Sequence, residues 1–347
     1  MRTLVLAAFV LSSYSSLSAQ GWNRQTAATY LDGRMTWWMG WPQSARDHDT
    51  FCISCHTALP FAMSRPALRT ALAEQGPSPI ERKLLDNVTK RVRLWKEVEP
   101  FYPDETRGVP KTAESRGTES ILNAVVLAAY DASSADARLA LDYMWDQQLK
   151  TGEAKGAWPW LQFHNSPWEG DSQYYGATLA AIAAGASPDH AEGARSLREY
   201  LTRERDSQIL FHRVMLLWAS SRMPGLLTPT QRKSIIDEAL SKQQPDGGFS
   251  LSSLVGAWKR RDNTPLESKS DGLATGVVGY ALQQAGVARD QPALKRALSW
   301  LSLNQDQKEG RWLAYSLNKE RDLSSDVGRF MSDAATANAV LALIGPK

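Results

Sequence analysis

Two cysteines and a histidine stand together in the segment Cys52-Ile53-Ser54-Cys55-His56, and these are the only cysteines among the 347 residues. Thiols at this spacing can add to the two vinyl groups of a haem, and the histidine beside the second thiol then lies under the iron as an axial ligand. The spacing therefore predicts one covalent c-type haem per chain, attached through Cys52 and Cys55, with His56 as the iron ligand.

Two other interpretations of this motif stay open. The thiols can form a reversible disulfide or dithiol pair, although no strand-helix-strand pattern, the usual setting of a redox dithiol, is found nearby. A structural zinc site needs four ligands, and the chain has no second cysteine pair. Haem is the favoured interpretation.

The N-terminus has the form of a secretory signal. Arg2 precedes an apolar run from Leu4 to Val10, and small and polar residues follow as far as Ala19. This pattern predicts a cleaved signal peptide over residues 1–19 and one mature domain over residues 20–347. The apolar run is well short of the roughly 20 residues that span a bilayer, so no transmembrane segment is expected. We expect the bacterial periplasm as the compartment.

Charge argues against one class of partner. The 40 basic and 37 acidic residues give a net charge of +3, and the two signs are interspersed along the chain rather than clustered. Nucleic-acid binding usually needs a basic patch or stripe, so no nucleic-acid partner is predicted.

Helical spacing of apolar residues runs through most of the chain and alternates between two kinds of segment. Short, strongly apolar helices are predicted at 118–130, 171–185, 209–220, 270–286 and 332–345. Longer, amphipathic helices are predicted before them at 80–97, 136–149, 191–203, 230–242 and 294–304. An outer helix predicted at 24–38 and an inner helix that starts at the cysteine motif form a first pair. The total is then about six pairs.

Such pairs favour two concentric layers, because an apolar helix must be covered on most sides whereas an amphipathic one shows a face to water. We therefore predict an all-α fold, an α/α toroid of about six helix pairs. An open solenoid is the alternative, but it needs polar capping repeats, and the last predicted helix ends in the apolar run 339–344.

A short motif recurs where helices are expected to meet. Its fullest copy is the run 296–301, Arg-Ala-Leu-Ser-Trp-Leu, followed by Gln305 and Gly310-Arg311-Trp312. A second, degenerate copy is Leu240 with Gln244 and Gly247-Gly248-Phe249, and a third copy is Tyr143-Met144 with Gln148 and Gly156-Ala157-Trp158. We expect the glutamine to satisfy free backbone groups at the start of the next helix, while tryptophan stacks on the turn and glycine allows close approach.

This motif is similar to the repeat signature of the terpenoid cyclases, and the chain resembles the squalene-hopene cyclase and protein prenyltransferase superfamily, most clearly from 143 to 344. The resemblance implies an α/α barrel around a central cavity. The chain lacks the Asp-x-Asp-Asp motif of class II cyclases and has no cysteine after Cys55 for a prenyltransferase zinc site. It also resembles an exported bacterial subgroup of toroid proteins with a Cys-x-x-Cys-His-Thr motif.

Polar residues near the starts of the inner helices are the candidates for catalysis, because those helix ends lie on one side of a toroid. They are Glu119, Asp171, Asp271, Asp333 and His212. Helix capping is the alternative role for the acids, and a hydrogen-bonded core position is the alternative for the histidine. Asp171 follows a cluster of aromatic residues (Trp158, Trp160, Phe163 and Trp168), which would raise its pKa or simply pack in the core.

Basic residues near this ring are candidates for contacts with the haem propionates or with an acidic substrate. They are Arg65, Arg116, Lys319 and Arg321, although an exposed charge is usually only solvated.

Three functions are consistent with these features. The favoured one is an exported haem protein, either a haem-dependent oxidoreductase with a cavity for a small or apolar substrate or an electron carrier with a periplasmic redox partner. The second is a non-redox isomerase or lyase, similar to the cyclases, that uses the cavity acids. The third is a ligand-binding module in which the cysteine pair only holds a loop.

Overall fold

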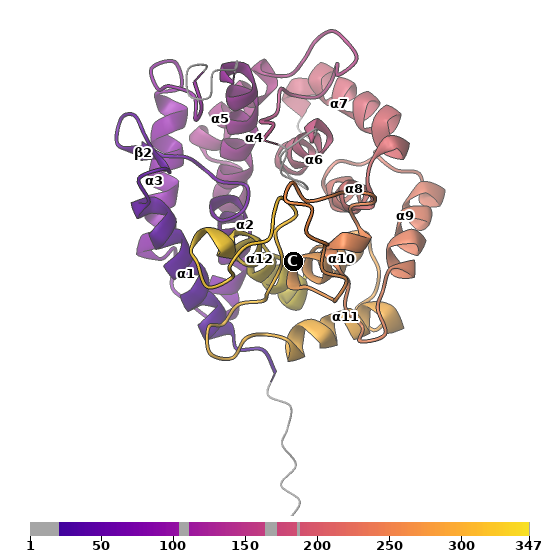
Figure 1. The fold of residues 1–347 in the computed structure, drawn as a ribbon. Helices are drawn as coiled ribbons and strands as arrows, with labels where there is room; N and C mark the ends of the chain where they lie inside the picture. Colours follow the sequence, from indigo (N-terminus) through magenta and orange to yellow (C-terminus); the bar gives the residue numbers. More distant parts are fainter. Residues whose placement is uncertain (1–20, 104–110, 164–171, 186–187, 347) are drawn as a thin grey trace, which may run out of the picture.

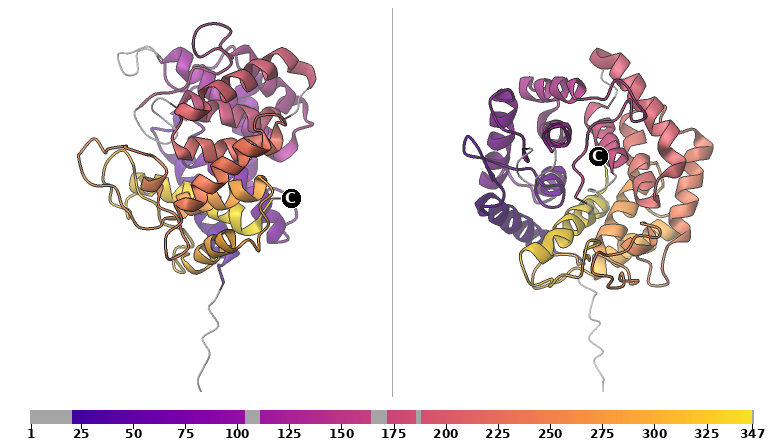
Figure 2. Two further views of the ribbon diagram at one scale, coloured as in Figure 1. Left: turned by 90° about the vertical axis from the view of Figure 1, so that its right-hand side faces the viewer. Right: turned by 45° about the horizontal axis from the view of Figure 1, so that its top comes forward.

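The structure is a computed structural model that describes residues 21–103, 111–163, 172–185 and 188–346, and these form a double ring of α-helices (Figures 1 and 2). The outer helices are α1 (Arg24–Gly40), α3 (Pro79–Arg93), α5 (Ala135–Asp146), α7 (Ala191–Glu204), α9 (Pro229–Ser241) and α11 (Pro292–Leu303). The inner helices are α2 (Ala58–Ala71), α4 (Thr112–Asp131), α6 (Gln173–Ala184), α8 (Leu210–Arg222), α10 (Gly272–Gln284) and α12 (Phe330–Ile344). The predicted toroid of six helix pairs is confirmed.

Most predicted helix bounds differ from the observed ones by a few residues, and α4 is the main exception. It begins at Thr112, six residues before the predicted start at Thr118. Gly117 lies inside this helix because it faces the chain at Pro159, where a β-carbon would sit only 2.2 Å from the Pro159 carbonyl oxygen. The early start places Glu119 two turns into the helix instead of at its beginning.

A short antiparallel hairpin, which the sequence did not reveal, precedes the cysteine motif. Strands β1 (Ala45–Arg46) and β2 (Thr50–Phe51) are joined by a turn in which His48 and Asp49 both have a φ of 52°. The Asn87 side chain on α3 bonds both backbone groups of Phe51, over 2.8 and 3.1 Å. The end of the hairpin, and with it the start of the cysteine motif at Cys52, is therefore held against α3 of the outer ring.

Glutamine side chains join consecutive outer helices. Gln305, just after α11, accepts the Asn23 N–H over 2.6 Å and donates to the carbonyls of Asn23 and Gly310 over 3.0 and 2.9 Å. Asn23 is the N-cap of α1, so this junction closes the ring between the two ends of the chain. Gly310 has a φ of 78° and packs against Thr26, where a β-carbon would lie 2.2 Å from the carbonyl oxygen.

Two more junctions repeat this arrangement, and one corrects the sequence assignment. Gln148 donates to the carbonyls of Gly156 and of Gly193 on α7, each over 3.0 Å. In the degenerate copy the equivalent residue is Gln243, which donates to Gly247 and to Ala293 on α11. The predicted Gln244 bonds the Ser268 carbonyl instead. The expected role of the motif in tying helix ends together is confirmed.

The tryptophans of the two complete copies are fully buried and anchor the same junctions. The Trp312 indole N–H donates to the Leu301 carbonyl over 2.8 Å, and that of Trp158 donates to the Met144 carbonyl over 2.5 Å. Each bond supplies a donor to a carbonyl in the last turn of an outer helix, where the regular backbone hydrogen bonds of the helix end.

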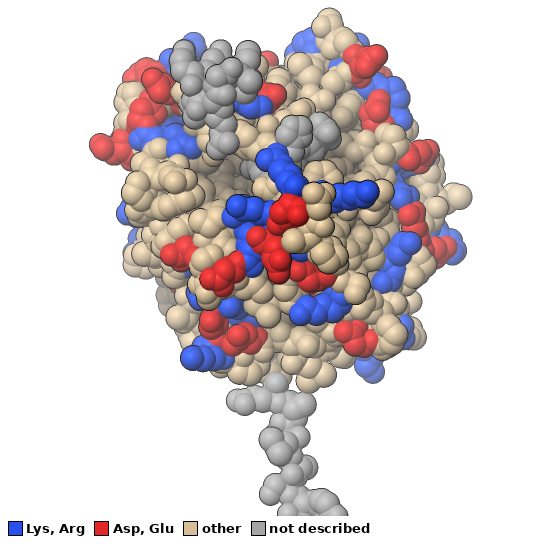
Figure 3. Space-filling model, in the orientation of Figure 1, with Lys and Arg blue, Asp and Glu red and all other residues tan. Residues whose placement is uncertain are grey.

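Within the described ranges, no helix has the length and the apolar composition that crossing a membrane requires. Acidic and basic side chains are mixed over the face shown in Figure 3, in agreement with their interspersed order in the sequence. The proposed signal peptide, residues 1–19, lies outside the described residues and stays a prediction.

Replacing Gln305 with alanine should weaken the closure of the ring. The substitution leaves the Asn23 N–H and the Gly310 carbonyl without their partner, a cost of about 1–3 kcal/mol for buried groups. Urea unfolding followed by circular dichroism should show a lower midpoint. Gln307, which is exposed in the same turn, is the matched control, and its replacement with alanine should change the free energy of unfolding by less than about 0.5 kcal/mol. Equal effects of the two substitutions would contradict the junction role of Gln305.

Candidate functional site

The cysteine motif lies between β2 and the first turn of α2, at the end of the barrel where the inner helices begin. Cys52 and Cys55 are both buried thiols. The Cys52 carbonyl accepts the Trp38 indole N–H over 2.7 Å, and the Ser54 hydroxyl accepts the N–H groups of Thr57 and Ala58 over 3.2 and 3.0 Å. The motif is thus held on one side by α1 and on the other by the start of α2.

His56 is half-buried and its ring is clamped by aromatic residues. Phe330, the first residue of α12, stacks on it with ring centroids 3.8 Å apart and an interplanar angle of 22°. Trp38 of α1 meets it edge-on at 5.2 Å and 85°. Helices from both ends of the chain therefore fix the orientation of one imidazole.

A chain of hydrogen bonds connects the same imidazole with a buried acid. The Nδ1 atom of His56 lies 2.9 Å from the Thr57 hydroxyl, which donates to Asp333 Oδ2 over 2.7 Å. The other oxygen of Asp333 accepts the Tyr30 hydroxyl over 2.7 Å and the Arg34 Nε–H over 2.8 Å. Asp333 on α12 thereby joins two residues of α1 with the residue that precedes α2.

The charge state of His56 follows from these surroundings. Burial, together with the nearby cations Arg34 and Arg321, lowers the pKa of His56 to about 3. The imidazole is therefore neutral at ordinary pH, which is the form that binds a metal ion. For Asp333, burial raises the pKa, while its three donors, Arg34 above all, oppose that effect.

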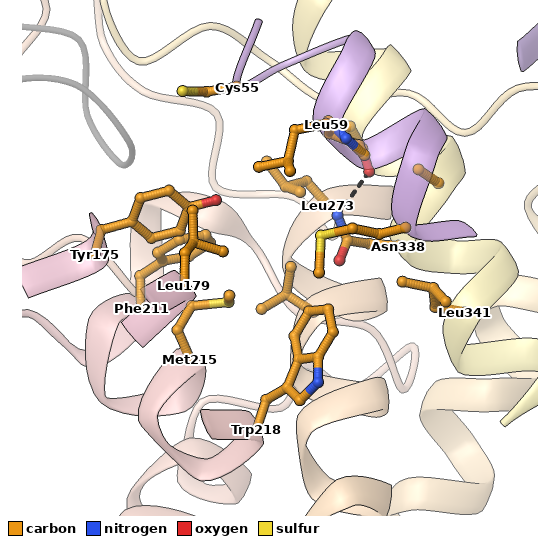
Figure 4. Close-up of a pocket in the computed structure, with 15 residues that line it drawn as sticks. Cys55, Leu59, Tyr175, Leu179, Phe211, Met215, Trp218, Leu273, Asn338 and Leu341 are labelled. Atoms are coloured by element: carbon orange, nitrogen blue, oxygen red, sulfur yellow. Dashed lines mark hydrogen bonds between the residues drawn. The ribbon is translucent and has the colours of Figure 1, made fainter. Parts of the chain in front are cut away.

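A cavity runs from Cys55 along the barrel axis and is almost filled by side chains. Cys55 borders one end and Trp218 the other, with Tyr175, Phe211 and Met215 pointing in between (Figure 4). Its volume of about 30 Å³ leaves space for water-sized groups only. A larger group attached at Cys55 has to lie outside this cavity. A second cavity, of about 250 Å³, lies where the inner helices end and is lined by alanines, Trp218, Tyr280 and Arg222.

Glu119, predicted to face the cavity mouth, lies elsewhere. Its carboxylate accepts the Arg91 Nε–H of α3 over 2.6 Å, and both side chains are fully buried between the two layers. Burial raises the pKa of Glu119, and the Arg91 guanidinium opposes this. Glu119 does not border the cavity next to Cys55.

Asp271 and His212 occupy positions that match their alternative roles. Asp271 is the N-cap of α10 and accepts the N–H groups of Ala274 and Leu251 over 2.9 and 2.5 Å. Burial raises the pKa of Asp271 to about 7. His212 is buried on α8 with Nδ1 3.1 Å from the Gln208 side-chain oxygen. Asp171 and Trp168 lie outside the described residues, whereas Trp158 and Trp160 are fully buried in the core.

The four basic candidates separate into different environments. Arg65 is buried and paired with Asp32 and Glu74 over 2.9 and 2.7 Å. Arg116 packs over the Trp95 ring at 4.7 Å, and Lys319 is exposed. Arg321 is half-buried, and its charge acts on His56. Arg321 is thus the basic candidate that the structure brings near the motif.

The residues that hold His56 were missed by sequence reasoning. Thr57 directly follows the motif, and no local pattern marks its hydroxyl as the link to Asp333, while Phe330 precedes the predicted start of its helix. Tyr30 and Arg34 are one helical turn apart on the buried side of α1. A cation on an otherwise buried helix face requires a carboxylate partner, and this was the signal available in the sequence.

A zinc site has no ligand set in the part of the chain that the structure describes. No three or more His, Cys, Asp or Glu side chains come together there in a way that could hold a metal ion. The zinc interpretation of the cysteine motif therefore gains no additional ligands from the fold.

Comparisons with known proteins identify the fold. No protein-family model matches the sequence, and a search of curated proteins finds no similar sequence. Among solved structures, an unsaturated glucuronyl hydrolase from Bacillus sp. GL1, described as responsible for the degradation of glycosaminoglycan, matches with a TM-score of 0.55 and 11% identity, over 92% of this chain and 96% of that one. A UGL variant with the saccharide dGlcA-Glc-Rha-Glc matches with a TM-score of 0.55 and 10% identity, over 92% and 97%. At these identities the similarity establishes the α/α toroid alone.

Asp271 should make stability depend on pH. Its pKa of about 7 in the folded protein exceeds the unfolded value of about 3.9, so the folded state binds more protons between these values and loses stability as pH rises from about 4 to 7. Asp271→Asn keeps an N-cap oxygen but cannot ionise. The stability of the wild type relative to this variant should therefore fall over that range, by about 1.4 kcal/mol for each unit of pKa difference. Urea unfolding at several pH values measures it, and parallel curves would contradict the raised pKa.

Proposed function

We propose that the protein is an exported c-type haem protein, with one haem joined to Cys52 and Cys55 and held through His56 at the mouth of the toroid. The observation that carries this proposal is a neutral, clamped imidazole directly beside two buried thiols. The donor set fits the group, because covalent attachment needs two thiols and iron accepts a neutral imidazole nitrogen. The haem-carrying relatives of the terpenoid cyclase toroids are the group in which we place this chain.

Each neighbouring residue has a defined task in this proposal. Phe330 and Trp38 hold the imidazole ring and keep water from its faces. Thr57 engages Nδ1, which leaves Nε2 as the nitrogen for the iron. Arg321 is the residue suited to a haem propionate. When bound, the haem supplies electron transfer or the activation of a small molecule at its iron.

The surroundings of Cys55 favour an apolar or small partner molecule over a charged one. The cavity that begins at Cys55 is lined by apolar side chains, with Tyr175 and Asn338 adding a hydroxyl and an amide, and none of the described residues around it is Asp or Glu. Periplasmic location and a periplasmic redox partner complete the proposal.

Intact mass is the direct test. The chain is produced with its own N-terminus in bacteria that carry haem-maturation machinery. The purified protein is denatured, and its intact mass is measured by mass spectrometry. We expect the mass of the chain without residues 1–19 plus one haem, and loss of the haem mass in the double variant Cys52→Ser/Cys55→Ser. Circular dichroism of that variant should still show a helical protein, because the ring closes through other residues. A wild-type protein without the haem mass would overturn the proposal.

A second candidate function is a hydrolase or lyase that acts on a saccharide. The similarity in fold to the unsaturated glucuronyl hydrolase favours it, and so does the buried Asp271, whose pKa of about 7 suits a general acid at neutral pH. Against it, Asp271, Asp333 and Glu119 are each engaged in structural contacts.

An activity assay separates the two candidates. Wild-type protein is incubated with unsaturated glucuronyl oligosaccharides, and the loss of the conjugated double bond is followed by ultraviolet absorption. The saccharide hypothesis expects turnover that falls at least tenfold in Asp271→Asn. Equal turnover in the two proteins would show that Asp271 is not the general acid. If covalent haem is present and no turnover is seen, the saccharide hypothesis fails and the haem proposal stands.

A further inference from the structure

The hydrogen bonds around Thr57 determine which nitrogen of His56 carries the proton. The Arg34 guanidinium is permanently charged and donates to Asp333 over 2.8 Å, so the acid acts as an ionised acceptor. The Thr57 hydroxyl has a single hydrogen and donates it to that carboxylate over 2.7 Å. Towards His56, 2.9 Å away, the same hydroxyl can then only accept. Nδ1 therefore carries the proton and Nε2 the lone pair.

We propose that Thr57 and Asp333 are positioning residues that set the tautomer and raise the basicity of His56, and thereby lower the reduction potential of the haem. This inference rests on the haem function proposed above. A histidine ligand that donates its second N–H towards a carboxylate becomes a stronger electron donor to the metal. A stronger donor favours the oxidised, more positive iron, so the potential falls.

This network also has a purely structural interpretation. Asp333 connects α12 with Tyr30 and Arg34 of α1, and these contacts alone would explain why the group is buried. The link through Thr57 to the imidazole adds nothing to the contact between α12 and α1. A change at Thr57 that leaves the bonds of Asp333 to Tyr30 and Arg34 in place therefore separates the two roles, because only the link to the imidazole can then alter the reduction potential.

Thr57 is therefore a better site for a test than Asp333. Asp333→Asn would weaken the partner of a buried arginine and act mainly on folding, because an uncompensated buried charge is costly. Thr57→Val keeps the branched shape of the side chain and removes the hydroxyl, and Thr57→Ser keeps the hydroxyl. Thr36→Val is the matched control, since Thr36 is an exposed α1 residue whose hydroxyl donates to the Asp32 carbonyl, away from the motif.

The experiment measures the midpoint potential of the haem-loaded, full-length mature protein by optical titration with redox mediators. We expect an upward shift in Thr57→Val, and wild-type potentials in Thr57→Ser and Thr36→Val, with the full haem mass in all four proteins. An unchanged potential in Thr57→Val with haem present would overturn the inference and leave the haem proposal intact.

A second measurement keeps the two proposals distinguishable. Protein made without haem maturation is labelled with 15N-histidine, and the His56 signals are identified with a His56→Gln variant. We expect a protonated Nδ1 in the wild type and a mixture of tautomers in Thr57→Val. A protonated Nδ1 here, combined with no haem mass in protein made with the maturation machinery, would overturn the haem proposal and retain the tautomer. A protonated Nε2 would overturn the hydrogen-bond network itself.

Discussion

The buried ion pair between Asp333 and Arg34 is the interaction on which the arrangement of this molecule depends. It joins the last helix to the first, and the two side chains are almost completely removed from solvent. A buried pair of charges is stable only when further hydrogen bonds satisfy both groups. Here Tyr30, Thr57 and Asp326 supply them, so the closing point of the ring and the surroundings of His56 belong to one network.

Three junctions between outer helices share one solution to the problem of the free backbone groups at helix ends. A glutamine at the end of one outer helix reaches the start of the next, and a glycine with positive φ lets the two helices approach. Because outer and inner helices alternate along the chain, the inner helices all begin on one side of the barrel. The cysteine motif lies on that side for this reason.

Much of this architecture was predictable and part of the site was not. Hydrophobic periodicity revealed the two layers, and the residues from Gln305 to Trp312 revealed a junction, because both signals are local. The start of α4 was misplaced because Gly117 and the polar residues before it look like a helix boundary, while a close approach to Pro159 explains the glycine. Gln243 and Gln244 are adjacent, and only the fold distinguishes the one that reaches the next helix.

Contacts between distant parts of the chain were beyond sequence reasoning. Glu119 was expected beside the cavity, yet its partner Arg91 lies 28 positions earlier and turns it towards the outer layer. Asp333 was expected as one acid among several, and its link with Thr57 spans 276 positions. No local pattern encodes such a pair. Arg34 and Arg91 are cations on helix faces that become buried, so they were the residues from which a carboxylate partner could have been inferred.

The position of Phe330 has a consequence for the order of events during folding. The motif near the N-terminus is covered by a residue 274 positions later, on the last helix of the chain. A polypeptide that emerges from a membrane N-terminus first therefore presents both thiols and the imidazole to solvent until its final segment arrives. The haem attachment proposed for Cys52 and Cys55 would have its best opportunity in that interval, before the docking of α12 covers the motif.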